Sequence, residues 1–131
     1  MMSADEAKAV PEPLECPCEG GSLDKLIQPA ILIVLSDGPL HGYGLAERLS
    51  EMPMFGGQRP DGAGVYRFLK SMEGKGFVAS QWDTSQRGPA RRSYEITADG
   101  ECCLRKWLTT LEAYRDGINF LVRAARKATT K

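Results

Sequence analysis

The sequence predicts a mainly α-helical fold with one small β-hairpin and a long last helix. Apolar residues recur at helical spacing over 23–36, 41–51 and 62–74. Two short strand-like runs follow at 77–82 and 93–97, and a helical pattern then runs from Asp99 to Lys127. The chain has 131 residues, 42% hydrophobic and 26% charged, as in one ordinary globular domain.

Turn-forming residues end the first two predicted helices. Ser22 can cap the helix over 23–36, and the segment SDGP ends it. Pro29 either kinks this helix or lies in its first turn, if the regular helix begins near Gln28. The helix over 41–51 has an apolar side of its own and ends at MPMFGGQRP, which is rich in proline and glycine.

The third predicted helix, over 62–74, has a core-facing stripe and a cationic side. Its apolar residues at i, i+3, i+4 and i+7 are Val65, Phe68, Leu69 and Met72. Arg67 and Lys70 fall off this stripe and are expected to face outward. The Gly-Ala-Gly segment at the start of the helix allows backbone N–H groups to approach a phosphate.

The last predicted helix is too long for the domain that carries it. At 1.5 Å per residue it would span ~43 Å, so its apolar stripe needs a partner chain. The residues expected at a dimer interface are Leu104, Trp107, Leu108, Leu111, Ile118 and Leu121. For Trp107 the alternative is an aromatic wall of a ligand pocket at the dimer seam.

Three helices, a hairpin and a long helix, in this order, are the plan of a winged helix-turn-helix with an added dimerisation helix. The plan divides the chain into an acidic flexible arm (1–21), a DNA-binding domain (22–98) and a dimerisation helix (99–131). The third helix would enter the major groove of DNA, and the hairpin wing would lie along the backbone or in the minor groove.

The charge distribution favours an anionic partner for the second half of the chain. Residues 1–57 hold 3 basic and 9 acidic residues, and residues 58–131 hold 14 basic and 8 acidic ones, so the balance changes from −6 to +6. The candidate DNA contacts are Tyr66, Arg67 and Lys70 of the third helix and Arg87, Arg91 and Arg92 of the wing loop DTSQRGPARR. Three arginines on a turn could alternatively be a solvated loop, but the helix-turn-helix order favours DNA.

Three segments carry a resemblance to a known family: LHGYGLAERL at 40–49, GVYRFLKSMEGKGFV at 64–78 and RGPARRSYEITADG at 87–100. They resemble the PadR family of winged-helix transcriptional regulators, in its short form with a single C-terminal helix. The resemblance implies a homodimer that binds a palindromic operator in double-stranded DNA, as a repressor released by an effector. One departure is Gly62-Ala63-Gly64, where the family commonly has a hydroxyl residue.

The cysteines are a second departure, and two interpretations of them stay open. Cys16 and Cys18 precede the first helix, and Cys102 and Cys103 open the last one. Four thiolates could bind zinc or an iron–sulfur cluster, or act as a redox switch. In the other interpretation Cys103 is a small core residue, Cys102 is exposed, and the CPC segment has no role.

Several functional classes find no support. The sequence has no nucleophile elbow, phosphate loop or HExxH motif, so we expect no enzyme. His41, the only histidine, begins a predicted helix, which suits a structural or capping role. No apolar run reaches ~18 residues and the N-terminus lacks a signal-peptide pattern, so a cytoplasmic protein without a membrane partner is expected.

The leading hypothesis is thus a homodimeric DNA-binding repressor that senses a metal, a redox state or a small molecule. The alternative is a winged helix that has lost DNA binding and acts as a protein-interaction module through its long helix. Arg87, Arg91 and Arg92 beside a basic third helix favour the first hypothesis, because an interaction module has no need of them.

Overall fold

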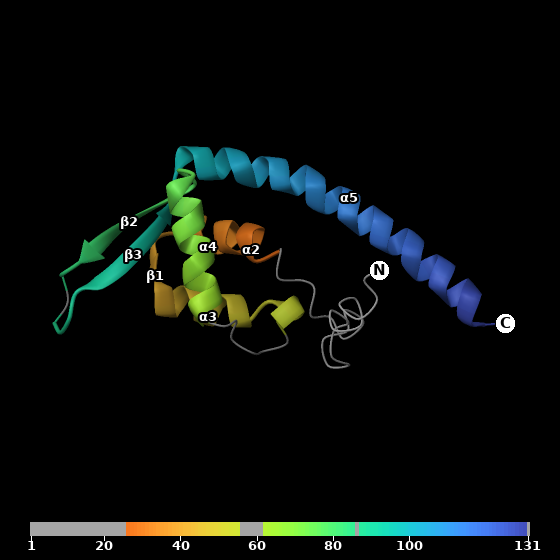
Figure 1. Cartoon of the computed structure of the whole chain (residues 1–131), viewed down its shortest axis with the longest axis horizontal. Coiled ribbons are helices and arrows are strands. Elements are labelled where there is room, and N and C mark those ends of the chain that lie inside the picture. Colours follow the sequence, from red (N-terminus) through yellow and green to blue (C-terminus); the bar gives the residue numbers. More distant parts are fainter. Residues whose placement is uncertain (1–25, 56–61, 86, 131) are drawn as a thin grey trace, which may run out of the picture.

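The computed structural model describes residues 26–55, 62–85 and 87–130. The elements in chain order are α2 (Ile27–Leu35), β1 (Leu40–His41), α3 (Gly42–Ser50), the 3₁₀ turn η4 (Pro53–Phe55), α4 (Gly62–Gly74), β2 (Val78–Asp83), β3 (Arg91–Ile96) and α5 (Ala98–Thr129). The helices α2, α3 and α4 cluster together, the β2–β3 hairpin projects from one end, and α5 passes over the cluster and continues beyond it (Figure 1). The predicted winged helix-turn-helix with a long last helix is confirmed.

The core lies where α2, α3, α4 and the sheet meet. Its fully buried side chains are Ile31, Leu32, Val34, Leu35, Leu45, Leu49, Val65, Leu69, Met72 and Val78. α2 is buried on nearly every side, because only Gln28 and Ile33 of its nine residues escape full burial. This helix therefore forms the centre around which the others pack.

The position of Pro29 agrees with one of the two alternatives for the first helix. α2 begins at Ile27, so Pro29 lies in the first turn, where the absent N–H costs no hydrogen bond. Residues 22–25, where the predicted helix was to begin, lie outside the described residues. The predicted helices over 41–51 and 62–74 correspond to α3 and α4.

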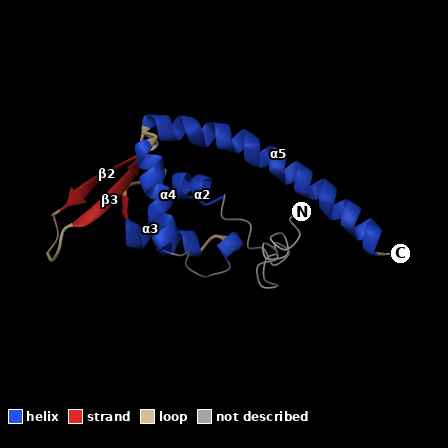
Figure 2. Ribbon diagram, viewed as in Figure 1, coloured by secondary structure: helices blue, strands red, loops and turns tan. Residues whose placement is uncertain are grey.

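The sheet corrects two details of the sequence prediction. It has three antiparallel strands in the order β1-β3-β2, whereas the sequence predicted only a two-stranded hairpin. β1 pairs with β3 at Leu40↔Tyr94, and β2 pairs with β3 from Val78↔Ile96 to Asp83↔Arg91. β3 also begins two residues earlier than predicted, so Arg91 and Arg92 lie on a strand and not in the wing loop. Figure 2 shows the three strands at one end of the helical cluster.

α5 is joined closely to the turn that follows α4. Thr97 caps the helix, because its Oγ1 accepts a hydrogen bond of 3.0 Å from the Gly100 N–H. The same hydroxyl donates to the Gly76 carbonyl at 2.6 Å. Gly100 is buried against the Phe77 carbonyl so closely that a Cβ there would collide with it. The start of α5 is therefore fixed to the domain, whereas every residue from 112 to 130 is exposed.

Candidate nucleic-acid interface

α4 presents the face that the sequence predicted. Val65, Leu69 and Met72 are buried in the core, with at most 1% of each exposed. Tyr66 on the outer side is 51% exposed, and Arg67 and Lys70 are exposed beside it. Because residues three and four apart share a helix face, these three side chains form one outward surface.

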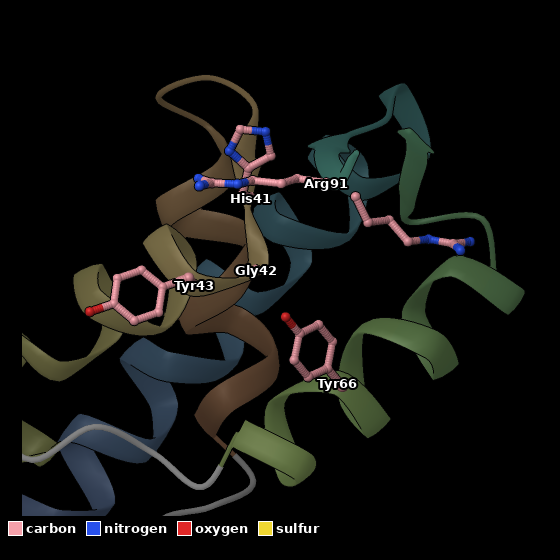
Figure 3. Close-up of a pocket in the computed structure, with 6 residues that line it drawn as sticks. His41, Gly42, Tyr43, Tyr66 and Arg91 are labelled. Atoms are coloured by element: carbon pink, nitrogen blue, oxygen red, sulfur yellow. The ribbon is translucent and has the colours of Figure 1, made fainter. Parts of the chain in front are cut away.

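An open groove of about 470 Å³ lies between α3, α4 and β3. Its lining residues are His41, Gly42, Tyr43, Tyr66, Arg91 and Arg92. Figure 3 shows the Tyr66 hydroxyl directed toward Gly42, and a Cβ at position 42 would overlap the end of the Tyr66 ring. The absence of a side chain at Gly42 thus lets α4 and the start of α3 approach each other closely.

A second groove, of about 590 Å³, adjoins the first along α4. Its lining residues are Tyr66, Lys70, Glu73, Gly74, Arg92 and Tyr94. Tyr66 and Arg92 belong to both grooves, so the two together form a continuous depression between the outer face of α4 and the wing. We call this depression the wing groove. Among the described residues that line it, Glu73 is the one that carries a carboxylate.

The three predicted wing arginines are held in different ways. Arg87 is exposed in the turn, next to Gly88, whose φ of 95° favours glycine. Arg91 is exposed and extends along the groove toward His41 in Figure 3. No described carboxylate forms an ion pair with Arg87 or Arg91. Their positive charge is therefore available to an outside partner.

Arg92 is already engaged within the chain. Its Nε donates a hydrogen bond of 3.0 Å to Ser80 Oγ, which in turn donates one of 2.7 Å to Glu73 Oε2. A terminal nitrogen of Arg92 lies 3.8 Å from the same Glu73 oxygen. The guanidinium also lies over the Trp82 ring, 5.4 Å from the centroid. These contacts connect β2 and β3 to α4.

A second side-chain contact connects the start of α3 to the wing. His41 Nε2 lies 3.0 Å from Asp83 Oδ2, and the other oxygen of Asp83 accepts hydrogen bonds from the Ser85 backbone N–H and hydroxyl. The Ser85 hydrogen bonds, with a smaller effect of His41, lower the pKa of Asp83 to about 2. His41 occupies the N-cap position of α3, but its side chain makes no capping hydrogen bond and contacts Asp83 instead.

α5 leaves three of its six predicted dimer residues exposed and the other three half-buried. Leu108, Ile118 and Leu121 are 56–63% exposed in the single chain. Leu104 and Trp107 pack partly against the chain's own core, and Leu111 is half-buried. An apolar groove of about 420 Å³ lies between α2 and α5, lined by Ile33, Glu101, Leu104, Arg105, Leu108 and Leu111.

Part of each surface was not predicted from the sequence. Gly42 and Tyr43 were not among the predicted DNA contacts, although the HGY segment opens a helix beside the third one. The predicted dimer residues also omitted Ile33, Tyr114, Phe120 and Val122, each between 42% and 63% exposed. The signal for Ile33 was present, because α2 is apolar on nearly every side and its helical spacing places Ile33 away from the buried residues.

The structure describes two of the four cysteines. Cys102 is exposed, and Cys103 packs partly against the core. Burial raises the pKa of the Cys103 thiol. Cys16 and Cys18 lie outside the described residues, and within the described ones no group of three or more histidine, cysteine or acidic residues is placed to hold a metal.

Comparisons with known proteins decide the family. The sequence model of the transcriptional regulator PadR-like family matches residues 31–106, from α2 into α5. The chain belongs to this family. None of the described helices is long and apolar enough to cross a membrane. No curated protein matches the chain.

Solved structures agree with the PadR assignment. A candidate transcriptional regulator from Thermoplasma acidophilum is 33% identical, with a TM-score of 0.67 over 76% of this chain and 93% of that one. A PadR-like transcriptional regulator from Bacillus cereus is 23% identical, with a TM-score of 0.65 over 76% and 94% of the two chains. A PadR family transcriptional regulator from Eggerthella lenta is 22% identical, with a TM-score of 0.63 over 93% and 97%. The last two likenesses show the fold alone.

Proposed function

We propose that this PadR-family regulator binds double-stranded DNA, as a homodimer, through the outer face of α4 and the wing groove. The observation that carries the proposal is a set of exposed cations on and beside the wing groove. Lys70 and Arg91 line the groove, Arg67 lies on the outer side of α4, and Arg87 lies in the wing turn. None of these four side chains has an ion pair with a described carboxylate. Such a surface gains free energy when phosphates displace its counterions.

The two parts of this face suit different parts of a DNA site. α4 has 13 residues, or about 20 Å of helix, and an α-helix fits the major groove. Arg67 and Lys70 on its outer side would reach base edges, and the Tyr66 hydroxyl would donate to a phosphate or a base. Arg87 and Arg91 would bind phosphates or enter the minor groove beside it.

The uncovered stripe of α5 supports the homodimer. The described residues of the chain leave Leu108, Ile118 and Leu121 exposed, and a twofold-related α5 would cover them with the same stripe in return. Ile33 of α2 and the apolar groove beside it extend this surface. A twofold dimer would place two α4 helices on half-sites of a palindromic operator, about 34 Å apart.

Repression released by an effector is the regulatory part of the proposal. A ligand, metal or oxidant that alters the dimer seam would change the separation of the two α4 helices and hence the fit to the operator. Cys102 and Cys103 lie at the start of α5, where such a change would act on both the domain and the seam. The exposed Cys102 is the better candidate for oxidation, because Cys103 is half-buried and burial raises the pKa of its thiol.

A gel-shift and salt titration with the DNA upstream of the protein's own gene tests DNA binding. Wild-type protein should bind this DNA more tightly than a scrambled duplex, and Arg67→Ala should reduce the difference. Arg126→Ala removes an equal charge from the far end of α5 and should leave the difference unchanged. If the wild-type protein shows no salt-dependent affinity for any duplex, the protein-interaction module is the better description.

Metal analysis and an absorption spectrum of anaerobically purified protein test the cysteines. Zinc or an iron–sulfur chromophore bound by all four thiols should disappear in Cys102→Ser and in Cys16→Ser alike. Loss of metal in only one of these variants, or its persistence in both, would rule out a shared site. Reversible loss of operator binding on oxidation, without metal, would instead support the thiol switch.

A further inference from the structure

The contacts of Arg92 differ from those of every other predicted DNA-binding residue. The hydrogen bonds that join Arg92, Ser80 and Glu73 run across three elements, from β3 through β2 to α4. They bridge 19 residues of sequence, from 73 to 92, and the Trp82 ring covers the guanidinium from the wing side. We call Glu73, Ser80, Trp82 and Arg92 the wing clamp.

Strand pleating explains why Arg91 and Arg92 differ although they are adjacent. Successive side chains of a strand point to opposite faces, so Arg92 shares the face of Tyr94, which is buried toward the core. The register pairs Arg92 with Trp82 and places Ser80 opposite Tyr94, on that same face. Arg91 lies on the other face and contacts none of these residues by a hydrogen bond or ion pair.

We propose that Arg92 is a positioning residue: with Glu73, Ser80 and Trp82 it fixes the wing on α4, and it raises DNA affinity by orienting Arg87 and Arg91 and not by binding a phosphate. The proposal rests on the proposed DNA-binding function. Its second support is the position of Glu73, which is a carboxylate inside a groove offered to a polyanion. A carboxylate there repels phosphate, and its presence in the groove is explained if it holds Arg92 in place.

Glu73→Gln distinguishes the two roles of Arg92 by the sign of its effect. If Arg92 binds a phosphate directly, removing the Glu73 charge frees the arginine and removes repulsion, so affinity should rise. If the clamp positions the wing, Glu73→Gln should lower affinity by about two- to five-fold, as expected for a half-exposed ion pair. Arg92→Ala should lower it by a similar factor, and the double variant should be no weaker than either single one.

The salt dependence separates Arg92 from its neighbour. Arg91→Ala should reduce the slope of log K against log salt by about 0.9 for each phosphate that the protein no longer neutralises. Arg92→Lys keeps the charge but loses the fork that donates to Ser80 and stacks on Trp82, so it should weaken binding at every salt concentration with the slope unchanged. Full affinity in Arg92→Lys, together with tighter binding by Glu73→Gln, would overturn the proposal.

A measurement without DNA tests the wing clamp independently of the proposed DNA binding. The chain has two tryptophans, Trp82 and Trp107, so its ¹⁵N–¹H spectrum contains two indole N–H signals, which Trp82→Phe assigns. Glu73→Gln and Arg92→Lys should both shift the Trp82 signal and leave the Trp107 signal in place. An unmoved Trp82 signal in both variants contradicts the clamp, whereas a shifted signal in a protein that binds no duplex would leave the clamp standing and refute only DNA binding.

Discussion

Apolar residues are buried in the domain that α2, α3, α4 and the sheet form. In the distal half of α5 they are exposed. In the domain, Ile31, Leu45 and Leu69 have no exposed surface. In α5, Ile118, Phe120 and Leu121 are each more than half exposed, although they are equally apolar. The domain therefore completes its own core, and the distal helix carries an apolar surface that the described residues of the same chain leave uncovered.

This difference separates two kinds of stability within one short chain. Side chains of the domain core contribute to the fold of a single chain, at any protein concentration. In the proposed homodimer, side chains of the distal α5 would contribute only after association, so their effect would depend on protein concentration. Substitutions in the two regions should consequently differ in what they change and in how dilution alters the change.

Leu121→Asp should have the largest effect. Burial of an unpaired carboxylate at the dimer seam costs about 3–5 kcal/mol, so we expect folded monomers without operator binding. Asn119→Asp adds the same charge two residues away, about 200° around the helix, and should still dimerise. Sedimentation and circular dichroism measure mass and helicity. A well-folded Leu121→Asp dimer would mean that another face of α5 forms the seam.

Leu69→Ala should have the next largest effect, and on the fold itself. Leu69 is fully buried, so its truncation should lower the free energy of unfolding by about 2–5 kcal/mol in urea denaturation. Leu121→Ala removes the same atoms from an exposed site and should cost nothing at concentrations where the chain is monomeric. Equal losses in the two variants at high dilution would contradict the division between the regions.

Gly100→Ala tests the junction between the two regions. A methyl group there meets the backbone carbonyl of Phe77, which cannot rotate away, so we expect a loss of about 1–3 kcal/mol in the free energy of unfolding. Gly117→Ala adds the same methyl in open space on the same helix and should stabilise it. Thermal unfolding of the two variants compares them directly. Equal stabilities would show that α5 can shift off the Phe77 turn at no cost.

Asp83→Asn should have the smallest effect on the free energy of unfolding, and this effect should depend on pH. The pKa of Asp83 falls from its ordinary 3.8 to about 2 in the folded chain, so its ionised form stabilises the fold above pH 4. This contribution is lost as the pH falls from about 4 toward 2. The gap in urea midpoint between wild type and Asp83→Asn should therefore narrow over that range. A gap that stays constant from pH 7 to pH 2 would show that the charge has no part in it.

The sequence predicted the helices well because their signals are local. The apolar spacing of α4 and the length of α5 can be read from consecutive residues, and the exposed positions of Arg67 and Lys70 follow from the same spacing. β1 was missed because two residues cannot show alternation, and they become a strand only through pairing with Tyr94 and Ser93.

The site was predicted in residue type but not in arrangement. Arg91 and Arg92 look alike in the sequence and are both exposed, and the register of β2 and β3 decides that Arg92 and not Arg91 is hydrogen-bonded to Ser80. The ion pair between Arg92 and Glu73 depends on how the sheet packs against α4, which no local pattern records. Sequence periodicity predicted which side chains of α4 are exposed, and tertiary pairing determines the individual contacts.

The Thr97 hydroxyl determines how a movement of α5 would be passed on to α4. It bonds to the start of α5 and to the carbonyl of Gly76, and the Thr97 N–H also donates to the Phe77 carbonyl at 3.1 Å. The β2–β3 hairpin separates α4 from α5 in the sequence, but these hydrogen bonds join the start of α5 directly to the turn that follows α4. In the proposed dimer, a rotation of a few degrees between the two α5 helices would rotate each α4 by the same angle. The displacement of α4 would grow with distance from its junction with α5.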